Sequence, residues 1–400
     1  MKDLTVDVVI VGAGPAGSIA AVNLAKAGVD VLVLEKRQEI GAPKRCAEGL
    51  NIMSLKKHGI DPNPRWAVQR IVSASLYSPS GKRILVQNQT TEGFVLERKN
   101  FEKHLAAEAI KAGARYMVKT LVTDVVIDGG GVRGVRAEYL GEEFSVSSRI
   151  VIAADGVDSL MAKKAGINTL NHLKDYHSGF QYEMGGLKNF DEQTLAIYFG
   201  NDVAPKGYVW IFPKGNRTAN VGIGIVGTRS DEGSRARDYL DRFIENHPEI
   251  FEGASPIEVN AGGIPVSAAV DTFVLDGFMV VGDAAQQVNP IHGGGIGLAM
   301  DAAKLAAGIA AEAIREGDVS RERLSEYERV WHEKDGAYLE KLMRIRLFLE
   351  KCDDNDFEGI ADIVSGEDVL KVMSGDYKYL LKIFVAKAPK LLPLARKFLS

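Results

Sequence analysis

Cysteine and net charge are both scarce in this sequence of 400 residues. Its two cysteines, Cys46 and Cys352, are too few for a disulfide framework, a four-thiolate zinc site or a self-contained four-cysteine iron–sulfur cluster. The formal net charge is −4, without the basic excess typical of nucleic-acid-binding proteins, so we expect no nucleic-acid partner. Two thiols without a disulfide pattern favour a reducing compartment, and we expect a cytoplasmic protein.

Long apolar runs are missing as well. The longest apolar stretch, residues 296–314, includes Asp301, Lys304 and Glu312, and it therefore predicts a buried or amphipathic helix and no membrane span. The N-terminus carries Asp3 where a signal peptide needs an apolar run. The histidines lack the spacing of metal ligands, and we expect no metal. Any contact with a membrane is then expected to be peripheral, at the inner face of the cell membrane.

Glycine, by contrast, is abundant, with 42 residues, and three segments match the pattern G-x-G-x-x-G. The first, residues 12–17, follows an apolar strand predicted at 6–11 and opens a helix. The matches at 129–134 and 222–227 lie at a hairpin turn and within or beside a strand. Neither of these two opens a helix, so we expect neither to bind phosphate.

The first glycine loop predicts a dinucleotide site. Its glycines permit a tight turn and a close approach of the backbone, and its helix directs free N–H groups at a pyrophosphate. A second strand predicted at 29–34 ends in Glu35, whose carboxylate can accept ribose hydroxyls and repels a 2′-phosphate. NADP is therefore disfavoured here. The alternative is a tight strand–helix turn that binds no ligand.

A second glycine-rich turn distinguishes FAD from NAD. Asp283 follows a short apolar strand at 278–281, where its carboxylate can bind a ribityl hydroxyl. The turn from Pro290 to Gly297 opens a long helix, whose N-terminus can stabilise negative charge on the N1–C2=O edge of a reduced flavin. NAD has neither a ribityl chain nor a ring that becomes anionic, so the expected cofactor is FAD. Taken alone, Asp283 is also consistent with a simple helix cap.

The predicted elements indicate an α/β fold: a Rossmann-like FAD-binding domain with an inserted antiparallel-sheet substrate domain and a helical C-terminal extension. Alternating strands with aromatic residues between 178 and 226 predict the inserted sheet, and the helical period after about residue 320 predicts the extension. We assign 1–65, 95–170 and 270–330 to the discontinuous FAD-binding domain, 66–94 and 171–269 to the substrate domain, and 331–400 to the C-terminal domain.

Three segments, in this order, resemble the flavoprotein group that contains p-hydroxybenzoate hydroxylase. They are the first glycine loop with Glu35, the segment 154–159 around Asp155, and Gly282-Asp283 with its glycine turn. Arg98, which leads from a strand into a helix, matches the group's arginine near the flavin. The resemblance covers about residues 1–330, and it implies that FAD is bound by Gly12, Gly14, Pro15, Ala16, Gly17, Glu35, Lys36, Arg45, Cys46, Ala47, Gly49, Arg98, Val122, Asp155, Gly156, Gly282, Asp283, Pro290, Gly293, Gly294, Gly295 and Ile296.

A narrower resemblance is to the geranylgeranyl reductases, and among them to the archaeal digeranylgeranylglycerophospholipid reductases. Residues 205–213, PKGYVWIFP, match the signature P-x-x-Y-x-W-x-F-P, and residues 44–49 match a cysteine-bearing loop near the flavin. The resemblance implies hydride delivery from FAD to the isolated alkenes of isoprenoid lipid chains. Because side chains alternate along a strand, we expect Tyr208, Trp210 and Phe212 on one face, lining an apolar tunnel for a prenyl substrate. The alternative is an ordinary aromatic sheet core.

The proton donor for this reaction is not evident from the sequence. An isolated alkene has no carbonyl to stabilise an anion, so proton transfer should lead or accompany hydride transfer, and aromatic faces would stabilise the carbocation character. The catalytic candidates are Cys46 and His292. Cys46 is expected beside the flavin, where it would tune the ring, contact the substrate or pair reversibly with a second thiol, and it is also consistent with a small buried residue. His292 is also consistent with a polar cap at a helix start.

Residues 377–400 form a basic, amphipathic tail without acidic residues. This tail fits the surface of an anionic bilayer, which a lipid substrate must leave, and it equally fits a helical cap over the substrate tunnel. Pro389 and Pro393 argue against one continuous interfacial helix. The reaction also needs an external electron donor, for which a reduced carrier protein, a deazaflavin and a nicotinamide all remain open.

Two other functions fit the same residues. An FAD-dependent aromatic hydroxylase, a monooxygenase, would share the fold and use oxygen, whereas the W-x-W-x-I-P motif of halogenases is missing around Trp210. A non-catalytic, FAD-containing lipid-binding protein would hold a prenyl chain without turnover. Turnover with reduced flavin separates the enzyme from the carrier, and oxygen dependence identifies the hydroxylase.

Overall fold

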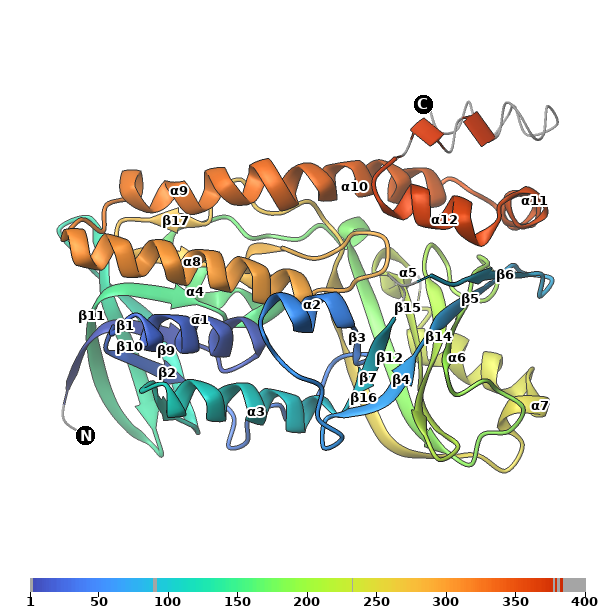
Figure 1. Cartoon of the computed structure of the whole chain (residues 1–400), viewed down its shortest axis with the longest axis horizontal. Helices are drawn as coiled ribbons and strands as arrows, with labels where there is room; N and C mark the ends of the chain where they lie inside the picture. The colour runs from blue at the N-terminus through green and yellow to red at the C-terminus, as the bar shows by residue number, and fades with distance from the viewer. Residues whose placement is uncertain (1–2, 89–91, 232, 377, 380–381, 384–400) are drawn as a thin grey trace.

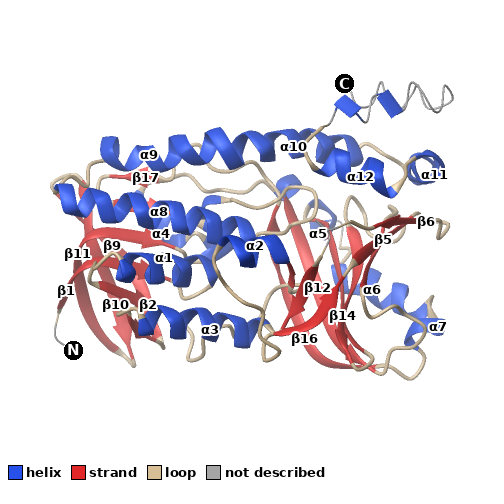
Figure 2. Cartoon of the chain, in the orientation of Figure 1, coloured by secondary structure: helices blue, strands red, loops and turns tan. Residues whose placement is uncertain are grey.

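A computed structural model describes residues 3–88, 92–231, 233–376, 378–379 and 382–383. The molecule is elongated, with a helix-covered sheet near the N-terminus at one end and a second large sheet at the other (Figure 1). Helices α9 (Arg321–Trp331) and α10 (Ala337–Leu349) run along one side from the first sheet towards the second (Figure 2). Most of the predicted tail at 377–400 lies outside the described residues.

The first sheet is built on parallel strands. β2, β1, β11 and β18 are neighbours that run in the same direction, and their Val- and Ile-rich sequences are buried on both faces, as is usual in parallel sheets. β8 extends one edge, β17 the other, and the β9–β10 hairpin pairs with β11. The bounds are β1 (Leu4–Val11), β2 (Val31–Leu34), β8 (Arg115–Met117), β9 (Thr120–Asp128), β10 (Gly131–Tyr139), β11 (Glu142–Ala153), β17 (Val274–Leu275) and β18 (Phe278–Val280).

Helices cover this sheet. Helix α1 (Pro15–Lys26) packs against both α3 (Arg98–Lys111) and α8 (Ile296–Glu316). Buried alanines line α8, at 302, 303, 306, 307 and 310, and their small side chains let the helices approach closely. Of two shorter helices, α2 (Ile52–Lys57) packs beside β3 (Gly49–Asn51), and α4 (Leu160–Ala165) packs beside β9.

The second sheet has a covered face and a face turned towards the first sheet. Val209, Ile211 and Val221 pack with Leu240 of helix α6 in a separate apolar core. The strand order is β16 (Ser255–Pro265), β12 (Tyr176–Gly185), β15 (Thr218–Val226), β14 (Tyr208–Gly215), β13 (Thr194–Tyr198), β5 (Ser73–Tyr77) and β6 (Arg83–Val86), beside α5 (Thr228–Asp231), α6 (Ala236–Glu245) and α7 (Pro248–Phe251).

The antiparallel sheet predicted from residues 178–226 is present, with one difference. β13 pairs with β5 in parallel; β5 comes from a much earlier segment, and its hairpin partner β6 forms the edge of the sheet. A small third sheet lies at the junction, formed by β3 (Gly49–Asn51), β7 (Gly93–Leu96) and β4 (Ala67–Ile71). The residue boundaries of the three domains stay a prediction.

The C-terminal extension is helical, as predicted. After α9 a π-helical segment, His332–Gly336, leads into α10, which is followed by α11 (Asp354–Ile363) and α12 (Gly366–Met373). Both of the last two helices begin with a capping box, at Asp353 and Ser365. Among the residues that the structure describes, no helix is both long and apolar enough to cross a bilayer.

Candidate functional site

The parallel strands bring four predicted segments to one edge of the first sheet. Strands β2, β1, β11 and β18 are adjacent and parallel, so their carboxyl ends lie side by side. Glu35 directly follows β2, Gly12 follows β1 and Ala154 follows β11. After β18 come Val281 and then Gly282. The carboxyl edge of such a sheet is where α/β proteins bind their ligands. Segments that are far apart in the sequence therefore share one ligand-binding edge.

The first glycine loop combines tight packing with one open position. A Cβ atom on Gly12, whose φ is +104°, would lie 2.4 Å from the carbonyl oxygen of Ala154, and one on Gly17 would lie 1.9 Å from that of Gly12. At Gly14, in contrast, no described atom lies within 4 Å of the Cβ position. Helix α1 begins next, at Pro15, without a side-chain cap or an acidic first turn among the described residues. Free N–H groups beside open space fit a pyrophosphate.

Backbone N–H groups hold the carboxylate of Glu35 beside this loop. Its two carboxylate oxygens accept N–H groups from Ala13 and Arg37, each at 2.9 Å. A carboxylate oxygen has a second lone pair, so both oxygens can still accept ribose hydroxyls. The next residue, Lys36, pairs with Asp158 at 3.6 Å, and both side chains are about half exposed.

Asp155 has one oxygen without a partner. Its Oδ2 accepts the N–H of Met161 at 2.9 Å, whereas its Oδ1 is buried and finds no hydrogen-bond partner among the described residues. Burial raises the pKa of Asp155. A buried, unsatisfied acceptor is rare in proteins and fits a ligand that donates a hydroxyl there. Gly156 follows with φ +76°, and Val122 is buried on β9.

Asp283 and Arg98 form the charged centre of the other half of the edge. Burial raises the pKa of Asp283, and the nearby Arg98 opposes that shift. Burial disfavours the charge of Arg98, but Glu102, Cys46 and Asp283 together raise its pKa, so it stays charged. A Cβ atom on Gly295 would lie 2.9 Å from Asp283 Oδ1, which places this carboxylate at the start of α8.

The second glycine turn surrounds His292. The Nδ1 atom of His292 accepts the N–H of Gly294 at 3.1 Å, and its carbonyl accepts the hydroxyl of Tyr208 at 2.6 Å. Desolvation by the surrounding protein lowers the pKa of His292 to about 4, although the residue is exposed. The same turn leads into α8 and holds Pro290, Gly293, Gly294 and Ile296.

The cysteine-bearing loop lies between the two large sheets. The carbonyl of Cys46 accepts the side-chain N–H of Gln181 at 3.1 Å, and its Sγ atom accepts the N–H of Glu48 at 3.2 Å. The carbonyl of Ala47 accepts the side-chain amide of Asn220 at 3.0 Å. Arg45 of the same loop also lies against β16, with its Cδ atom 3.3 Å from a Cβ position on Gly262. Three strands of the second sheet, β12, β15 and β16, therefore contact this loop.

The aromatic residues of β14 share one face, as predicted. Val209 and Ile211 point into the core beside α6, while Tyr208, Trp210 and Phe212 face the first sheet. The rings of Tyr208 and Trp210 are 5.8 Å apart at an angle of 61°. Phe212 reaches the loop, 3.1 Å from a Cβ position on Gly49.

The third glycine motif supplies a floor for this aromatic face. A Cβ atom on Gly222 of β15 would lie 2.4 Å from the indole ring of Trp210. The motif therefore makes room for a side chain. Gly222 and Gly224 lie within β15, but Gly227 leads directly into the four-residue helix α5, so the expectation that no helix follows this motif is wrong; that the motif binds no phosphate stays a prediction.

His177 is a site residue that the sequence reasoning missed. It lies on β12, lines a small pocket of about 40 Å³ together with Tyr208, Ile291 and Arg346, and its Nε2 atom is buried without a partner among the described residues. Burial, with a contribution from Arg346, lowers the pKa of His177 to about 4. The imidazole is neutral at neutral pH.

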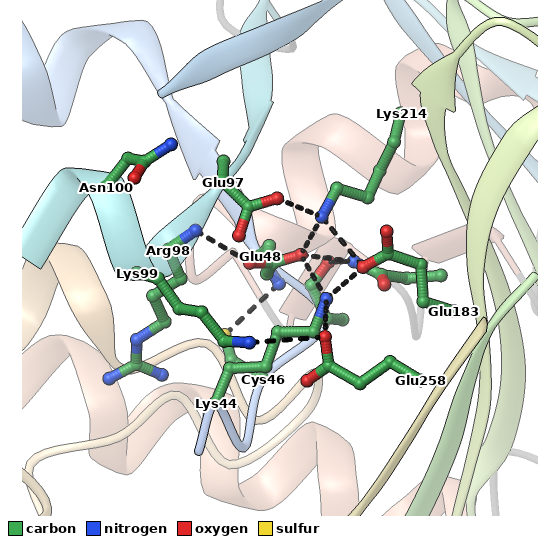
Figure 3. A network of polar contacts seen from close by, with 12 residues as sticks. Lys44, Cys46, Glu48, Glu97, Arg98, Lys99, Asn100, Glu183, Lys214 and Glu258 are labelled. Atoms are coloured by element: carbon green, nitrogen blue, oxygen red, sulfur yellow. Dashed lines mark hydrogen bonds and ion pairs between the residues drawn. The ribbon is translucent and has the colours of Figure 1, made fainter. Parts of the chain in front are cut away.

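A buried network of charges, which we call the loop clamp, was also missed (Figure 3). Glu48 accepts from Lys214 at 2.9 Å, from Lys44 at 3.2 Å and from Asn220 at 2.8 Å. Burial disfavours the charge of Lys214, but Glu48 and its neighbours raise the pKa of this lysine, so it stays charged. The clamp consists of Lys44, Glu48, Glu97, Glu183, Lys214, Asn220 and Glu258.

The alternation of side chains along β12 and β14 is the signal that could have revealed His177 and the residues of the loop clamp. Lys214 lies two residues beyond Phe212 on β14, and His177, Gln181 and Glu183 occupy alternate positions of β12. Alternate residues of a strand share a face. Polar side chains on the same face as Trp210 therefore mark a second half of the site, but only the pairing of β12 with β15 shows that they lie opposite it.

These features define an FAD-dependent oxidoreductase. Residues 7–184 match the family model described as FAD dependent oxidoreductase, and residues 175–264 match that of the geranylgeranyl reductase catalytic domain. The open glycine loop, the fixed Glu35 and the unpaired Asp155 oxygen fit that cofactor.

The chain belongs to the geranylgeranyl reductase family. It is 44% identical to the digeranylgeranylglycerophospholipid reductase of Methanocaldococcus jannaschii, covering 96% of both chains, and 42% identical to digeranylgeranylglycerophospholipid reductase 1 of Methanothermobacter thermautotrophicus, covering 98% of both. A crystal structure of a geranylgeranyl bacteriochlorophyll reductase-like protein from Thermoplasma acidophilum superposes with a TM-score of 0.90 at 34% identity, covering 99% of this chain and 100% of that one.

Flavin-dependent halogenases share the fold alone. The brominase Bmp2, as a triple mutant, superposes with a TM-score of 0.77 at 19% identity, covering 95% of this chain and 98% of that one. At this level of identity the likeness concerns the arrangement of sheets and helices. The chemistry must be argued from the residues at the site.

Proposed function

We propose that this protein saturates the C=C bonds of geranylgeranyl chains in ether-linked membrane lipid precursors, with reduced FAD as the hydride source. The observation that carries the proposal is the aromatic face of β14, laid over a glycine floor and directed at the ligand edge of the first sheet. The relatives at 42–44% identity are named for this lipid class.

Residues along the edge of the first sheet would bind each part of FAD in turn. Gly14 and the start of α1 would bind the pyrophosphate, Glu35 the adenosine ribose, and Asp283 the ribityl chain. The start of α8 would stabilise negative charge on the reduced ring. When bound, FAD supplies a hydride to one alkene carbon.

The substrate chain would lie along Tyr208, Trp210 and Phe212. Aromatic faces attract positive charge, so these rings would stabilise carbocation character on the alkene while excluding water. The hydroxyl of Tyr208 donates to the backbone carbonyl of His292, and Gly49 of the cysteine-bearing loop lies against Phe212 on the same face. His292, neutral at pH 7 because of its low pKa, has no extra proton to donate, which leaves the thiol of Cys46 as the stronger of the two candidates for the proton.

Two partners complete the proposal. An external donor, a reduced carrier protein, a deazaflavin or a nicotinamide, would supply electrons, because the first glycine loop is already assigned to FAD. A peripheral contact with the inner face of the cell membrane would deliver the lipid. Flotation of the protein with anionic vesicles, and its absence with neutral ones, is the expected result for the membrane contact.

The decisive experiment is anaerobic. The FAD-loaded protein is reduced with dithionite and mixed with a geranylgeranyl ether lipid, and the product mass is read. We expect a gain of two hydrogens per double bond as the flavin reoxidises. Reoxidation only on admission of oxygen would replace the proposal by an aromatic hydroxylase, and lipid binding without either change would replace it by a carrier.

A matched pair of tyrosine variants controls this experiment. Tyr208→Phe removes the hydrogen bond to His292 on the aromatic face, whereas Tyr182→Phe removes a bond of 2.9 Å to Asp241 on the opposite face of the sheet. We expect Tyr208→Phe to lower kcat about 10-fold and Tyr182→Phe to leave it unchanged. Equal effects would contradict the placement of the substrate.

A further inference from the structure

We propose that Gln181 is a positioning residue that couples the cysteine-bearing loop to the indole of Trp210. The inference deepens the proposed function and rests on it for its catalytic consequence. Gln181 lies on β12 with 3% of its surface exposed, and nothing in the sequence motifs points to it. Its side chain lies between the two groups that the site needs in register.

The amide of Gln181 makes two hydrogen bonds of opposite sense. Its Oε1 accepts the indole N–H of Trp210 at 2.8 Å, and its Nε2 donates to the carbonyl of Cys46 at 3.1 Å. An indole offers only a donor and a carbonyl only an acceptor, so the bridge needs one group that is both. A carboxamide meets this need without charge, and its two partners fix which way it points.

Each partner of Gln181 is already constrained on its other sides. Gly222 leaves space for the indole of Trp210 on one face, and Tyr208 packs against it edge-on. The loop is anchored two residues before and two residues after Cys46, where Lys44 and Glu48 enter the loop clamp. The amide of Gln181 therefore joins two constrained groups, the indole of Trp210 and the loop around Cys46. Its loss should change the position of both.

The position of Cys46 is what this bridge would set. The loop that carries Cys46 contacts Arg98, whose N–H donates to Glu48 at 2.7 Å, and Phe212, which lies 3.1 Å from the Cβ position of Gly49, so the loop lies between the candidate flavin residues and the candidate substrate face. A shift of the loop relative to Trp210 would misalign the two reactants. A misplacement of about 1 Å costs roughly 100-fold in rate in well-ordered active sites.

The test uses the FAD-loaded protein in a Cys352→Ser background, so that Cys46 is the one remaining thiol. Gln181→Met removes both hydrogen bonds at similar volume, and Tyr182→Phe is the matched control, one residue along the same strand on its opposite face. The two readouts are the rate at which a thiol reagent modifies Cys46, and kcat and KM in the lipid assay.

We expect Gln181→Met to speed thiol modification about 10-fold, because the loss of one hydrogen bond to the loop makes local opening easier by that factor. We expect kcat to fall about 10- to 100-fold while KM changes less than about 3-fold, since alignment and not binding is lost. Tyr182→Phe should stay within about 2-fold of the parent in both. Thiol and kcat values of Gln181→Met that match this control would overturn the proposal.

Two further variants keep the test decisive if Gln181→Met does not fold. Gln181→Glu, assayed at a pH high enough to ionise the new carboxylate, keeps the acceptor for Trp210 and loses the donor to Cys46, so the thiol rate should rise while the tryptophan emission stays unchanged. Trp210→Phe loses the indole arm alone, and the thiol rate should rise about 3-fold through the released amide. An unchanged thiol rate in both variants sinks the coupling.

The outcomes also separate this inference from the proposed function. If the parent protein saturates no lipid, the proposed function fails, while the thiol rates still decide whether Gln181 holds the loop. If the parent turns over and the thiol rates do not respond, the proposed function stands and the role of Gln181 is wrong.

Discussion

One face of the second sheet carries two contrasting halves. At one end, Glu183 and Lys214 meet Glu48 in the loop clamp, where the charged groups are paired with one another, although Oδ1 of Asn220 has no partner among the described residues. At the other end, Trp210 and Tyr208 lie over glycine, and His177 keeps an unpaired nitrogen beside a small pocket. The strands are the same, and only the side chains at alternate positions differ.

The contrast shows how one sheet can both hold a loop and leave space for a ligand. Buried charges in the clamp are satisfied by each other, so that end tolerates no rearrangement without exposing a lone charge in an apolar setting. The aromatic end has small residues beneath large rings, so space there is built into the backbone. The predictions below test this division of roles.

The largest expected effect concerns Glu48, the centre of the clamp. Glu48→Gln keeps the shape but removes the charge shared by Lys44 and Lys214, and we expect a loss of about 3 kcal/mol in the free energy of unfolding. Urea denaturation measures it. Glu92→Gln is the control, because Glu92 pairs with the exposed Arg70 at 2.8 Å and should cost less than about 1 kcal/mol. Equal losses would mean that the clamp is no stronger than a surface pair.

The next effect concerns the glycine floor. Gly222→Ala places a methyl group where the indole of Trp210 now lies, so we expect a loss of about 2 kcal/mol from overpacking together with a fall in kcat. Gly308→Ala is the control, since its Cβ position in α8 is open and helix propensity should then raise stability by about 0.5 kcal/mol. A neutral Gly222→Ala variant would show that the indole can move away.

The smallest effect is a pH dependence from His177. Its folded pKa of about 4 lies below the ordinary 6.5, so the unfolded state binds more protons and stability falls as the pH drops from about 6.5 towards 4. We expect this residue to account for a loss of about 2 kcal/mol between pH 7 and pH 5.

Urea denaturation at both pH values measures this share. His177→Gln should reduce the difference between pH 7 and pH 5 by that amount, whereas His172→Gln, at an exposed histidine, should leave it as in the parent. A His177→Gln variant with the full pH dependence of the parent would place the titration elsewhere, and the pocket would then be wet enough to solvate an imidazolium.

The order of strands and helices could be predicted from the sequence, because buried strands and helices have distinct local patterns of apolar residues. Continuous Val and Ile predict parallel strands, and a glycine loop between strand and helix predicts a phosphate site whatever the rest of the chain does. The alternation of Tyr208, Trp210 and Phe212 was predictable for the same reason, since the period of a strand is two. The parallel pairing of β5 with β13 was not, because nothing local in either strand specifies its neighbour.

The sequence by itself therefore determined the FAD fold, the family and the aromatic strand, because short motifs of neighbouring residues indicate each of them. The tertiary structure alone decided that Glu48 meets Lys214, that Gly222 lies beneath Trp210, and that Gln181 reaches Cys46. Glu48 and Lys214 are 166 positions apart and Gln181 and Cys46 are 135 apart, while Gly222 and Trp210 face each other on two neighbouring strands. Their register follows from how two sheets pack face to face, which depends on the balance of all the buried side chains at once and not on any one segment.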